Sequence, residues 1–341
     1  MRRFSLFASL GSLSTFALSA TARGDYQPPA GYELIPLFDS SNQPLAPEGL
    51  GVSASGEMAV TNGDTVTLYN TWQNGRTVIG SVTNPAWLYD SDPVFLNNST
   101  ILFSENGNTD ALWSVNFSAP LPAITQVTPT GSLPFVEGVT VLDSTHALVS
   151  GQNPTPPSYS GALYLDSVDL TKTSGNISNV VSNVGSGYPG NPAVTPGDHL
   201  VLLEGLSLSG SAFAHVYTST GSSFADDALD NGNGSGEAYG IAFDSAGIAY
   251  VTTDHTITKI SGIDAVTPGV SEFGNEGGGF LSSISYTGGA FNAGQAGDTG
   301  ALIVNDSDGG AFAIVVPEPA SVGAIGGIAM LLTARRRRRR Q

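Results

Sequence analysis

The sequence predicts an all-β protein built as a six-bladed β-propeller. A pattern of strand, tight turn and strand recurs along the chain and is clearest from Gly240 to Thr252. There, apolar residues alternate on both sides of the turn Asp244-Ser245-Ala246-Gly247, as expected of two half-buried strands. Successive copies begin about 44 to 54 residues apart, close to the period typical of propeller blades. The 43 glycines and 20 prolines also disfavour long helices.

The repeat can be counted without gaps. In five copies, nine residues separate the Gly or Pro that begins the first strand from a residue in the second strand. These pairs are Gly49 and Met58, Pro93 and Leu102, Gly138 and Ala147, Pro192 and Val201, and Gly240 and Ala249. We call the first residue of each pair the opener. A sixth, looser copy begins at Ile284 and continues at 301–304.

Residues 1–22 are predicted to be a cleavable secretory signal peptide. Arg2 and Arg3 supply the positive start, residues 4–18 are mostly apolar, and Ala20-Thr21-Ala22 is a small-residue cleavage site. We therefore expect an exported protein whose mature chain begins at residue 23. A buried N-terminal helix is the alternative interpretation of this segment.

The predicted strands follow in order through residues 23–316, the body of the protein. A strand at 32–38 comes first, and its Pro36 favours an edge position. The six blades then comprise 50–53, 58–62, 66–69 and 77–82; 94–96, 101–104, 111–116 and 124–128; 139–142, 147–150, 161–166 and 177–184; 193–195, 200–203, 212–217 and 222–224; 241–243, 249–253, 256–260 and 270–273; and 282–286, 301–305 and 311–316.

Blade six therefore lacks a fourth strand, whereas the strand at 32–38 lacks a blade. Pairing the two would close the ring and leave no long unpaired edge between the first and last blades. The repeat resembles those of six-bladed NHL-repeat and gluconolactonase-like propellers over residues 32–316. This resemblance implies a fold and no particular chemistry. A multi-strand sandwich or two small β domains are the alternative folds.

The body is strongly acidic. It contains four of the 12 Lys and Arg residues and 28 of the 29 Asp and Glu residues, which gives a net charge close to −24. Such a surface repels phosphate backbones, so we expect no binding to nucleic acid. The chain has no cysteine, which excludes disulfides, zinc thiolates and a thiol nucleophile.

Residues 317–341 form a three-part tail. Pro317-Glu318-Pro319 precedes the apolar segment 322–334, which is shorter than the ~20 residues of a stable membrane span. A basic cluster follows, which would stay on the cytoplasmic side of a membrane. Its members are Arg335, Arg336, Arg337, Arg338, Arg339 and Arg340.

This order of parts resembles the PEP-CTERM sorting signal of bacterial exported proteins. The resemblance implies that Pro317, Glu318 and Pro319 are recognised by an exosortase-type membrane protease, which cleaves nearby and removes the tail. It also implies transient anchoring in the inner membrane through a short transmembrane helix, followed by release to the cell surface or the extracellular matrix. An ordinary C-terminal anchor is the alternative interpretation.

Polar residues precede the openers of the first four blades. Glu48, Asp92, Glu137 and Asn191 stand there, followed by Tyr239 and Ser282 in the last two blades. The start of each innermost strand faces the central channel of a propeller, so these oxygens would form a site suited to Ca²⁺. Gluconolactonase-like propellers are similar in carrying Glu, Asn and Asp around a channel metal. The alternative is a polar, water-filled channel mouth.

Two functions from different classes remain open. The first is a non-enzymatic surface or matrix protein that associates with extracellular polysaccharide, the setting that the tail resemblance implies. Trp72, Trp87 and Trp113 could then form an aromatic platform for sugar rings, although such residues more often fill the space between blades. The second is a metal-dependent, lactonase-like hydrolase. The lack of a G-x-S-x-G motif and the few Lys and Arg residues favour the first.

Overall fold

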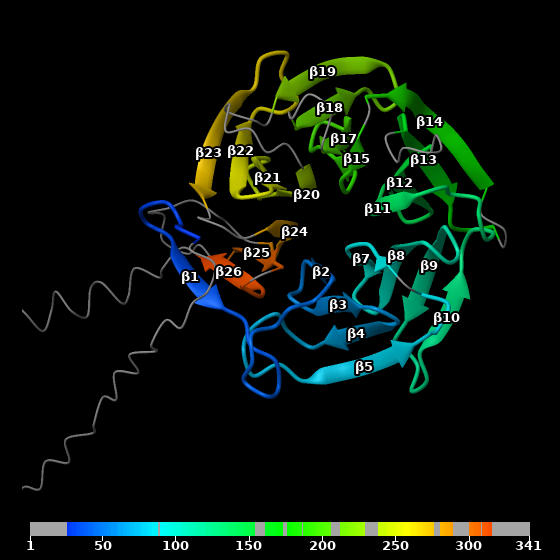
Figure 1. Ribbon diagram of the computed structural model, residues 1–341, viewed down its shortest axis with the longest axis vertical. Helices are drawn as coiled ribbons and strands as arrows, with labels where there is room; N and C mark the ends of the chain where they lie inside the picture. Colours follow the sequence, from blue (N-terminus) through cyan, green and yellow to red (C-terminus); the bar gives the residue numbers. More distant parts are fainter. Residues whose placement is uncertain are drawn as a thin grey trace, which may run out of the picture.

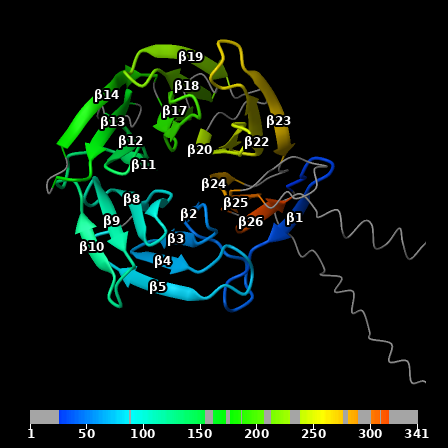
Figure 2. The same ribbon diagram turned by 180° about the vertical axis from the view of Figure 1, so that it is seen from behind.

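In the computed structural model, six β-sheets are arranged as blades around a central axis (Figure 1). The structure describes residues 26–87, 89–153, 161–172, 176–185, 187–205, 212–228, 238–275, 280–288, 300–307 and 309–315. Within these residues every helix or strand assigned is a strand, so the predicted six-bladed, all-β propeller is confirmed. The view from behind shows the same ring (Figure 2).

Each blade places its strands in chain order from the axis outward, except that the N-terminal strand takes the outermost place in blade six. Blades one to three contain β2 (Gly49–Val52), β3 (Met58–Asn62), β4 (Thr65–Tyr69) and β5 (Val78–Thr83); β6 (Tyr89–Asp90), β7 (Val94–Asn97), β8 (Thr100–Asn106), β9 (Ala111–Asn116) and β10 (Ala123–Gln126); and β11 (Val136–Val141), β12 (His146–Gln152), β13 (Leu163–Asp169) and β14 (Asn176–Val184). Blades four to six contain β15 (Tyr188–Pro189), β16 (Ala193–Val194), β17 (Leu200–Gly205), β18 (Phe213–Tyr217) and β19 (Ser223–Ala228); β20 (Ala238–Phe243), β21 (Ala249–Thr253), β22 (Thr256–Ser261) and β23 (Gly269–Asn275); and β24 (Leu281–Tyr286), β25 (Ala301–Asp306) and β26 (Phe312–Val315).

The N-terminal strand closes the ring, as the sequence predicts. β1 (Glu33–Pro36) pairs antiparallel with β26 and supplies the outermost strand of blade six. In Figure 1 this blade combines the blue start of the described chain with its red end. Pairing the two ends of the described chain in one sheet leaves the first and last blades without a free edge at the seam.

The turn between β20 and β21 shows how the repeat sequence produces its hairpin. The Asp244 carboxylate accepts hydrogen bonds from the amides of Ala246 and Ile248, each 2.9 Å long. Gly247 adopts a φ of 75°, which costs glycine little because it has no Cβ. The Asp244 side chain therefore stabilises the turn, and the alternating residues on either side form the hydrogen-bonded strands β20 and β21.

The apolar core lies between the blades. Six clusters of buried side chains are found in the described residues, one at each interface between neighbouring blades. Trp87 and Trp113 are buried between blades one and two, with ring centroids 5.7 Å apart. Trp72 packs partly buried against the cluster between blades six and one. The tryptophans fill space between blades, which is the interpretation that the sequence favoured over an exposed platform for sugar rings.

The innermost strand is broken in blades two and four. In blade two the break between β6 and β7 contains Asp92 and Pro93, and in blade four the break between β15 and β16 contains Asn191 and Pro192. A proline has no N–H for the ladder, so it interrupts the strand where it stands. The sequence predicted one short strand in each place, and the break frees the preceding polar residue for contacts at the axis.

The predicted signal peptide at 1–22 and the predicted tail at 317–341 lie outside the described residues. In the described part of the chain, no helix is long and apolar enough to cross a membrane.

Candidate functional site

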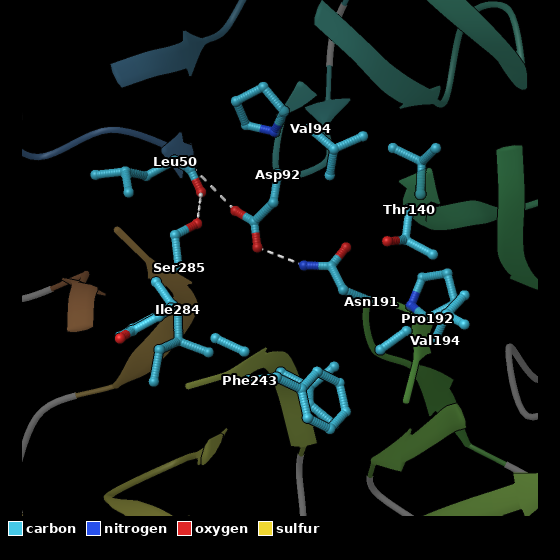
Figure 3. A pocket seen from close by; sticks show the side chains of 16 residues that line it. Leu50, Asp92, Val94, Thr140, Asn191, Pro192, Val194, Phe243, Ile284 and Ser285 are labelled. Carbon is cyan, nitrogen blue, oxygen red and sulfur yellow. Dashed lines mark hydrogen bonds between the residues drawn. The ribbon is translucent and has the colours of Figure 1, made fainter. Parts of the chain in front are cut away.

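A pocket of about 320 Å³ occupies the centre of the ring (Figure 3). The innermost strand region of every blade contributes to its lining. We call it the channel pocket, and its lining residues are Leu50, Asp92, Pro93, Val94, Val139, Thr140, Asn191, Pro192, Ala193, Val194, Ile241, Ala242, Phe243, Ile284, Ser285 and Tyr286. Most are apolar, and a few polar side chains lie among them, as in most small-ligand sites.

Asp92 and Asn191 form the polar centre of the channel pocket, where Figure 3 shows them pointing toward one another. The Asp92 carboxylate accepts a hydrogen bond from the Leu50 amide through Oδ1, at 3.1 Å, and another from the Asn191 side-chain amide through Oδ2. One carboxylate therefore joins the innermost strands of blades one, two and four. Both oxygens of the Asp92 carboxylate therefore accept hydrogen bonds from the protein itself.

A glycine in blade three allows Asp92 and Asn191 to meet. A Cβ placed on Gly138 would lie 2.6 Å from the Asn191 Cα and 2.7 Å from its Oδ1, closer than real side chains approach. Since Gly138 has no side chain, Asn191 can lie over blade three and reach the carboxylate of blade two. This explains a direct contact between residues 99 positions apart in the chain.

The openers alternate between glycine and bulkier residues around the ring. Blades one, three and five open with glycine, whereas blades two, four and six place Pro93, Pro192 and Ile284 at the equivalent positions. Backbone or side-chain atoms of the next blade lie within 3 Å of the Cβ that any of these three glycines would gain. The blades therefore pack at the axis in pairs, and the glycines make room for their bulkier neighbours.

Burial raises the pKa of Asp92 to about 6, against the lowering effect of its hydrogen bonds from Leu50 and Asn191. The buried Ser283 hydroxyl also lies close enough to lower this pKa, although no atom of the described residues is in hydrogen-bond geometry with it. The sequence placed Ser282 at this sixth position. A register shift between Leu281 and Ser283 places Ser283 there instead.

Of the four residues predicted to share a channel metal, Asp92 and Asn191 meet at the axis, whereas Glu48 and Glu137 bond to other groups. The side chain of Glu48 is exposed and accepts a 2.8 Å hydrogen bond from the Gly63 amide, so it caps the hairpin between β3 and β4. Glu137 accepts a 2.5 Å hydrogen bond from Asn106, and burial raises its pKa to about 7. Among the described residues, no three His, Cys, Asp or Glu side chains lie together as a metal site would require.

The segment from Asp226 to Glu237 partly matches the sequence of a calcium-binding loop through Asp226, Asp230 and Glu237, but these side chains lie outside those that the structure describes. Three histidines pair with carboxylates, which the sequence alone did not indicate: His146 with Asp143 at 3.2 Å, His199 with Asp264 at 2.7 Å and His215 with Glu204 at 2.6 Å. The pair of His199 and Asp264 links blade four to blade five.

Replacing Asp92 with asparagine is expected to stabilise the protein at alkaline pH. The raised pKa means that the folded protein keeps a proton that the unfolded chain releases, so this contribution to stability is lost as the pH rises from about 4 through about 6. Asparagine stays neutral and can still accept from Leu50 through Oδ1. Its new Nδ2 can donate to Asn191 once the Asn191 amide turns its unpaired Oδ1 toward it. A shift of two pKa units corresponds to about 3 kcal/mol at pH 8.

Thermal melting of both proteins at pH 4.5 and pH 8 measures this effect. The difference in melting temperature between the two pH values should shrink in Asp92→Asn and stay unchanged in Glu33→Gln, which removes an exposed carboxylate from β1. A variant that is less stable than the natural protein at pH 8 would show that the charge of Asp92 stabilises the fold.

The fold has counterparts among solved structures. Virginiamycin B lyase from Staphylococcus aureus superposes with a TM-score of 0.53 and 12% identity, covering 84% of this chain and 100% of that one. A luciferin-regenerating enzyme gives 0.58 and 11%, covering 84% and 95%, and a streptogramin B lyase gives 0.52 and 12%, covering 84% and 98%. No protein-family model and no curated protein sequence matches the chain. At this level of identity the similarity shows the propeller fold alone.

Proposed function

We propose that this chain is an exported bacterial propeller that binds extracellular polysaccharide without transforming it. The channel pocket carries the proposal, because all six blades build it and its apolar walls surround a single acid–amide pair. Its volume of about 320 Å³ lies at the lower end of the range of about 300–1,000 Å³ typical of ligand sites. A pocket of this size suits one sugar unit or chain end.

The state of Asp92 supports binding over catalysis. A general acid or base must exchange its proton with a bound substrate. Here Oδ1 and Oδ2 of Asp92 already accept hydrogen bonds from Leu50 and Asn191. This carboxylate therefore holds three innermost strands in place, and we assign it the role of keeping the pocket in shape.

The charge of the body indicates which polymers would bind. A net charge close to −24 over residues 23–316 repels polyanions, so we infer that the polysaccharide is neutral. Hydroxyl groups can donate to the many carboxylates of the body without charge on the ligand.

Binding can be tested with residues 23–316 in native gels that contain dextran or laminarin, two neutral glucans. Migration should be retarded in either neutral glucan and unchanged in alginate, an anionic polymer. The glucans should be recovered intact, with no new reducing ends. Unchanged migration in both neutral glucans, or release of shortened products, would contradict the proposed function.

One observation favours the second function, a divalent-metal-dependent lactonase-like hydrolase, with Ca²⁺ as the expected ion. Burial raises the pKa of Glu137 to about 7, a value that suits acid–base catalysis near neutral pH. Lactone and ester hydrolysis should therefore be assayed with Ca²⁺ and with EDTA. If the protein hydrolyses a lactone or ester, if this activity requires Ca²⁺, and if Glu137→Gln abolishes it, the function is catalysis and not binding.

We also propose that residues 317–341 are a sorting tail that an exosortase-type protease removes. The proposal rests on Pro317-Glu318-Pro319, the apolar segment and the terminal arginines, in that order. The two prolines would keep the cleavage region extended and separate from the following helix. The arginines would hold the end of the tail at the inner face of the membrane until cleavage.

Replacing Pro317-Glu318-Pro319 by three alanines is expected to block this processing in a bacterium that carries an exosortase. The intact mass of the exported natural protein should lack the terminal arginines, and the variant should keep them and stay with the membrane fraction. Changing Arg335–Arg340 to lysine preserves the positive charge, so that control should still be processed. An exported natural protein that keeps its arginines would contradict the proposal.

A further inference from the structure

Four aromatic residues stand at the start of the innermost strands of four successive blades. Phe135 comes directly before β11, Tyr188 begins β15, Tyr239 is the second residue of β20, and Phe280 comes directly before β24. We call these four residues the aromatic arc. Every blade repeats the same strand order, so the innermost strands all begin at one face of the ring. The arc therefore follows the channel mouth on that face.

Hydrogen bonds link the strands that carry the arc. The Phe135 carbonyl accepts a 3.1 Å hydrogen bond from the Gln152 amide, and the Gln152 side chain donates to the Gly187 carbonyl, next to Tyr188, at 2.7 Å. The Tyr239 carbonyl in turn accepts from the backbone amide of Asn191 at 2.7 Å. Through Asn191, the arc adjoins the channel pocket.

The rings of the arc are accessible from outside. Tyr188 exposes 39% of its surface, and Phe135, Tyr239 and Phe280 are partly exposed. The rings of Tyr239 and Phe280 lie in contact, with centroids 4.5 Å apart and planes inclined by 59°. The four residues thus leave apolar surface exposed at the same position of successive blades, and exposed apolar surface gathered on one face marks interaction sites.

The backbone at Phe135 supports a role beyond packing. Phe135 has a φ of 47°, in the left-handed region that bulky residues rarely occupy. Such strain persists where the surrounding structure imposes it, and it concentrates at binding and active sites. The strained residue is itself a member of the arc.

Carboxylates accompany the rings. Glu137 follows Phe135 by two residues and is partly buried beside Asn106, and the Asp254 carboxylate accepts a 3.2 Å hydrogen bond from the Tyr239 hydroxyl. Aromatic faces stack on the C–H faces of sugar rings, and carboxylates accept hydrogen bonds from sugar hydroxyls. Negative charge on this face also excludes acidic polymers.

We propose that the aromatic arc is the surface on which this propeller binds a neutral polysaccharide chain, with successive sugar rings stacked on Tyr188, Tyr239 and their neighbours. This inference rests on the proposed function and adds the residues that recognise the polymer. The channel pocket at the centre of the arc is then the place for a chain end, whereas the arc holds the chain itself.

The test compares single variants of residues 23–316 for binding to dextran and laminarin by affinity electrophoresis. Tyr188→Ala and Tyr239→Ala should each weaken binding about tenfold, whereas Tyr239→Phe keeps the ring and should bind almost as well as the natural protein. The matched control is Phe224→Ala. Phe224 is a partly exposed aromatic residue whose ring stacks on His199, 4.2 Å away, beside a turn on the opposite face. Melting curves confirm that each variant is folded.

The outcomes separate the two proposals. Weaker binding in both alanine variants, with unchanged binding in Phe224→Ala, supports the aromatic arc. Equal binding of the natural protein and both alanine variants overturns the arc and leaves polysaccharide binding in place, at another surface. Unchanged migration of the natural protein in both glucans overturns the proposed function, and the arc as a polysaccharide site with it.

Discussion

Gly51→Ala is expected to destabilise the protein by about 3 kcal/mol or more. A Cβ at this position would lie 1.8 Å from the carbonyl oxygen of Pro93, in the break of the innermost strand of the next blade. Both groups belong to the backbone around a narrow axis, so neither can move without shifting a strand and the channel pocket beside it. For a chain of about 290 residues, 3 kcal/mol lowers the melting temperature by roughly 5 °C.

Differential scanning calorimetry of residues 23–316 measures the loss. Gly269→Ala is the matched control, because a Cβ there would meet its nearest neighbour, the Ser261 Cβ, at 3.8 Å, an ordinary contact distance. Its effect should stay within about 0.5 kcal/mol. If Gly51→Ala melted at the same temperature as Gly269→Ala, the close packing of blades at the axis would not limit stability.

A chain that begins at Asp39 is expected to lose the cooperative fold. It lacks β1, which pairs with β26, and it lacks Leu37, which is buried between blades six and one. It also lacks Tyr26, whose ring stacks on Phe312 with centroids 5.1 Å apart. Without these residues β26 becomes an open edge with part of its apolar cover removed, and such edges pair with other chains.

Calorimetry and size-exclusion chromatography should therefore show a broad or absent melting transition and aggregation for the chain from residue 39. The chain from residue 23 is the control, and it should melt in a single transition as a monomeric ring. An equal transition temperature for the two chains would contradict the idea that the N-terminal strand closes and stabilises the propeller.

Much of the fold could be predicted because the information is local. In Gly240–Thr252, alternation and turn chemistry occur within about a dozen residues, so the sequence alone reveals a hairpin. Counting the copies of this repeat then gave an unassigned strand at 32–38 and a sixth blade with three strands in place of four. β1 paired with β26 confirms the closure that followed from this count.

The centre of the site could be predicted only in part, because it depends on contacts between blades. The position before each opener correctly placed Asp92 and Asn191 at the axis. Asn191 reaches Asp92 because Gly138 has no side chain in the way. The distance between these two residues depends on how closely the blades approach the axis, and a local sequence pattern does not contain that information. Glu48 has the same sequence position but faces the hairpin of its own blade, where the Gly63 amide satisfies its carboxylate.

The aromatic arc was missed for a similar reason. The tryptophans attracted attention as the largest aromatic residues, and Trp87 and Trp113 are buried because their size fills the widening space between blades. The signal that could have found the arc was present: each of its four residues stands within four residues before the opener of a blade. Repeat position, more than residue size, indicates which aromatic side chains line the mouth of the channel.

The seam of blade six also has a mechanical consequence. Glu33 lies opposite Val315, so the two ends of the described chain leave the ring at the same corner. A pull on the C-terminal end would act along the axis of β26, and β26 is bonded to β25 on one side and to β1 on the other. The hydrogen bonds between these strands are perpendicular to the force, so the ladders β1–β26 and β26–β25 are both loaded in shear. Both ladders must break before β26 is pulled out. A propeller tethered by its C-terminal end would thus bear load at the strand pair that also completes its ring.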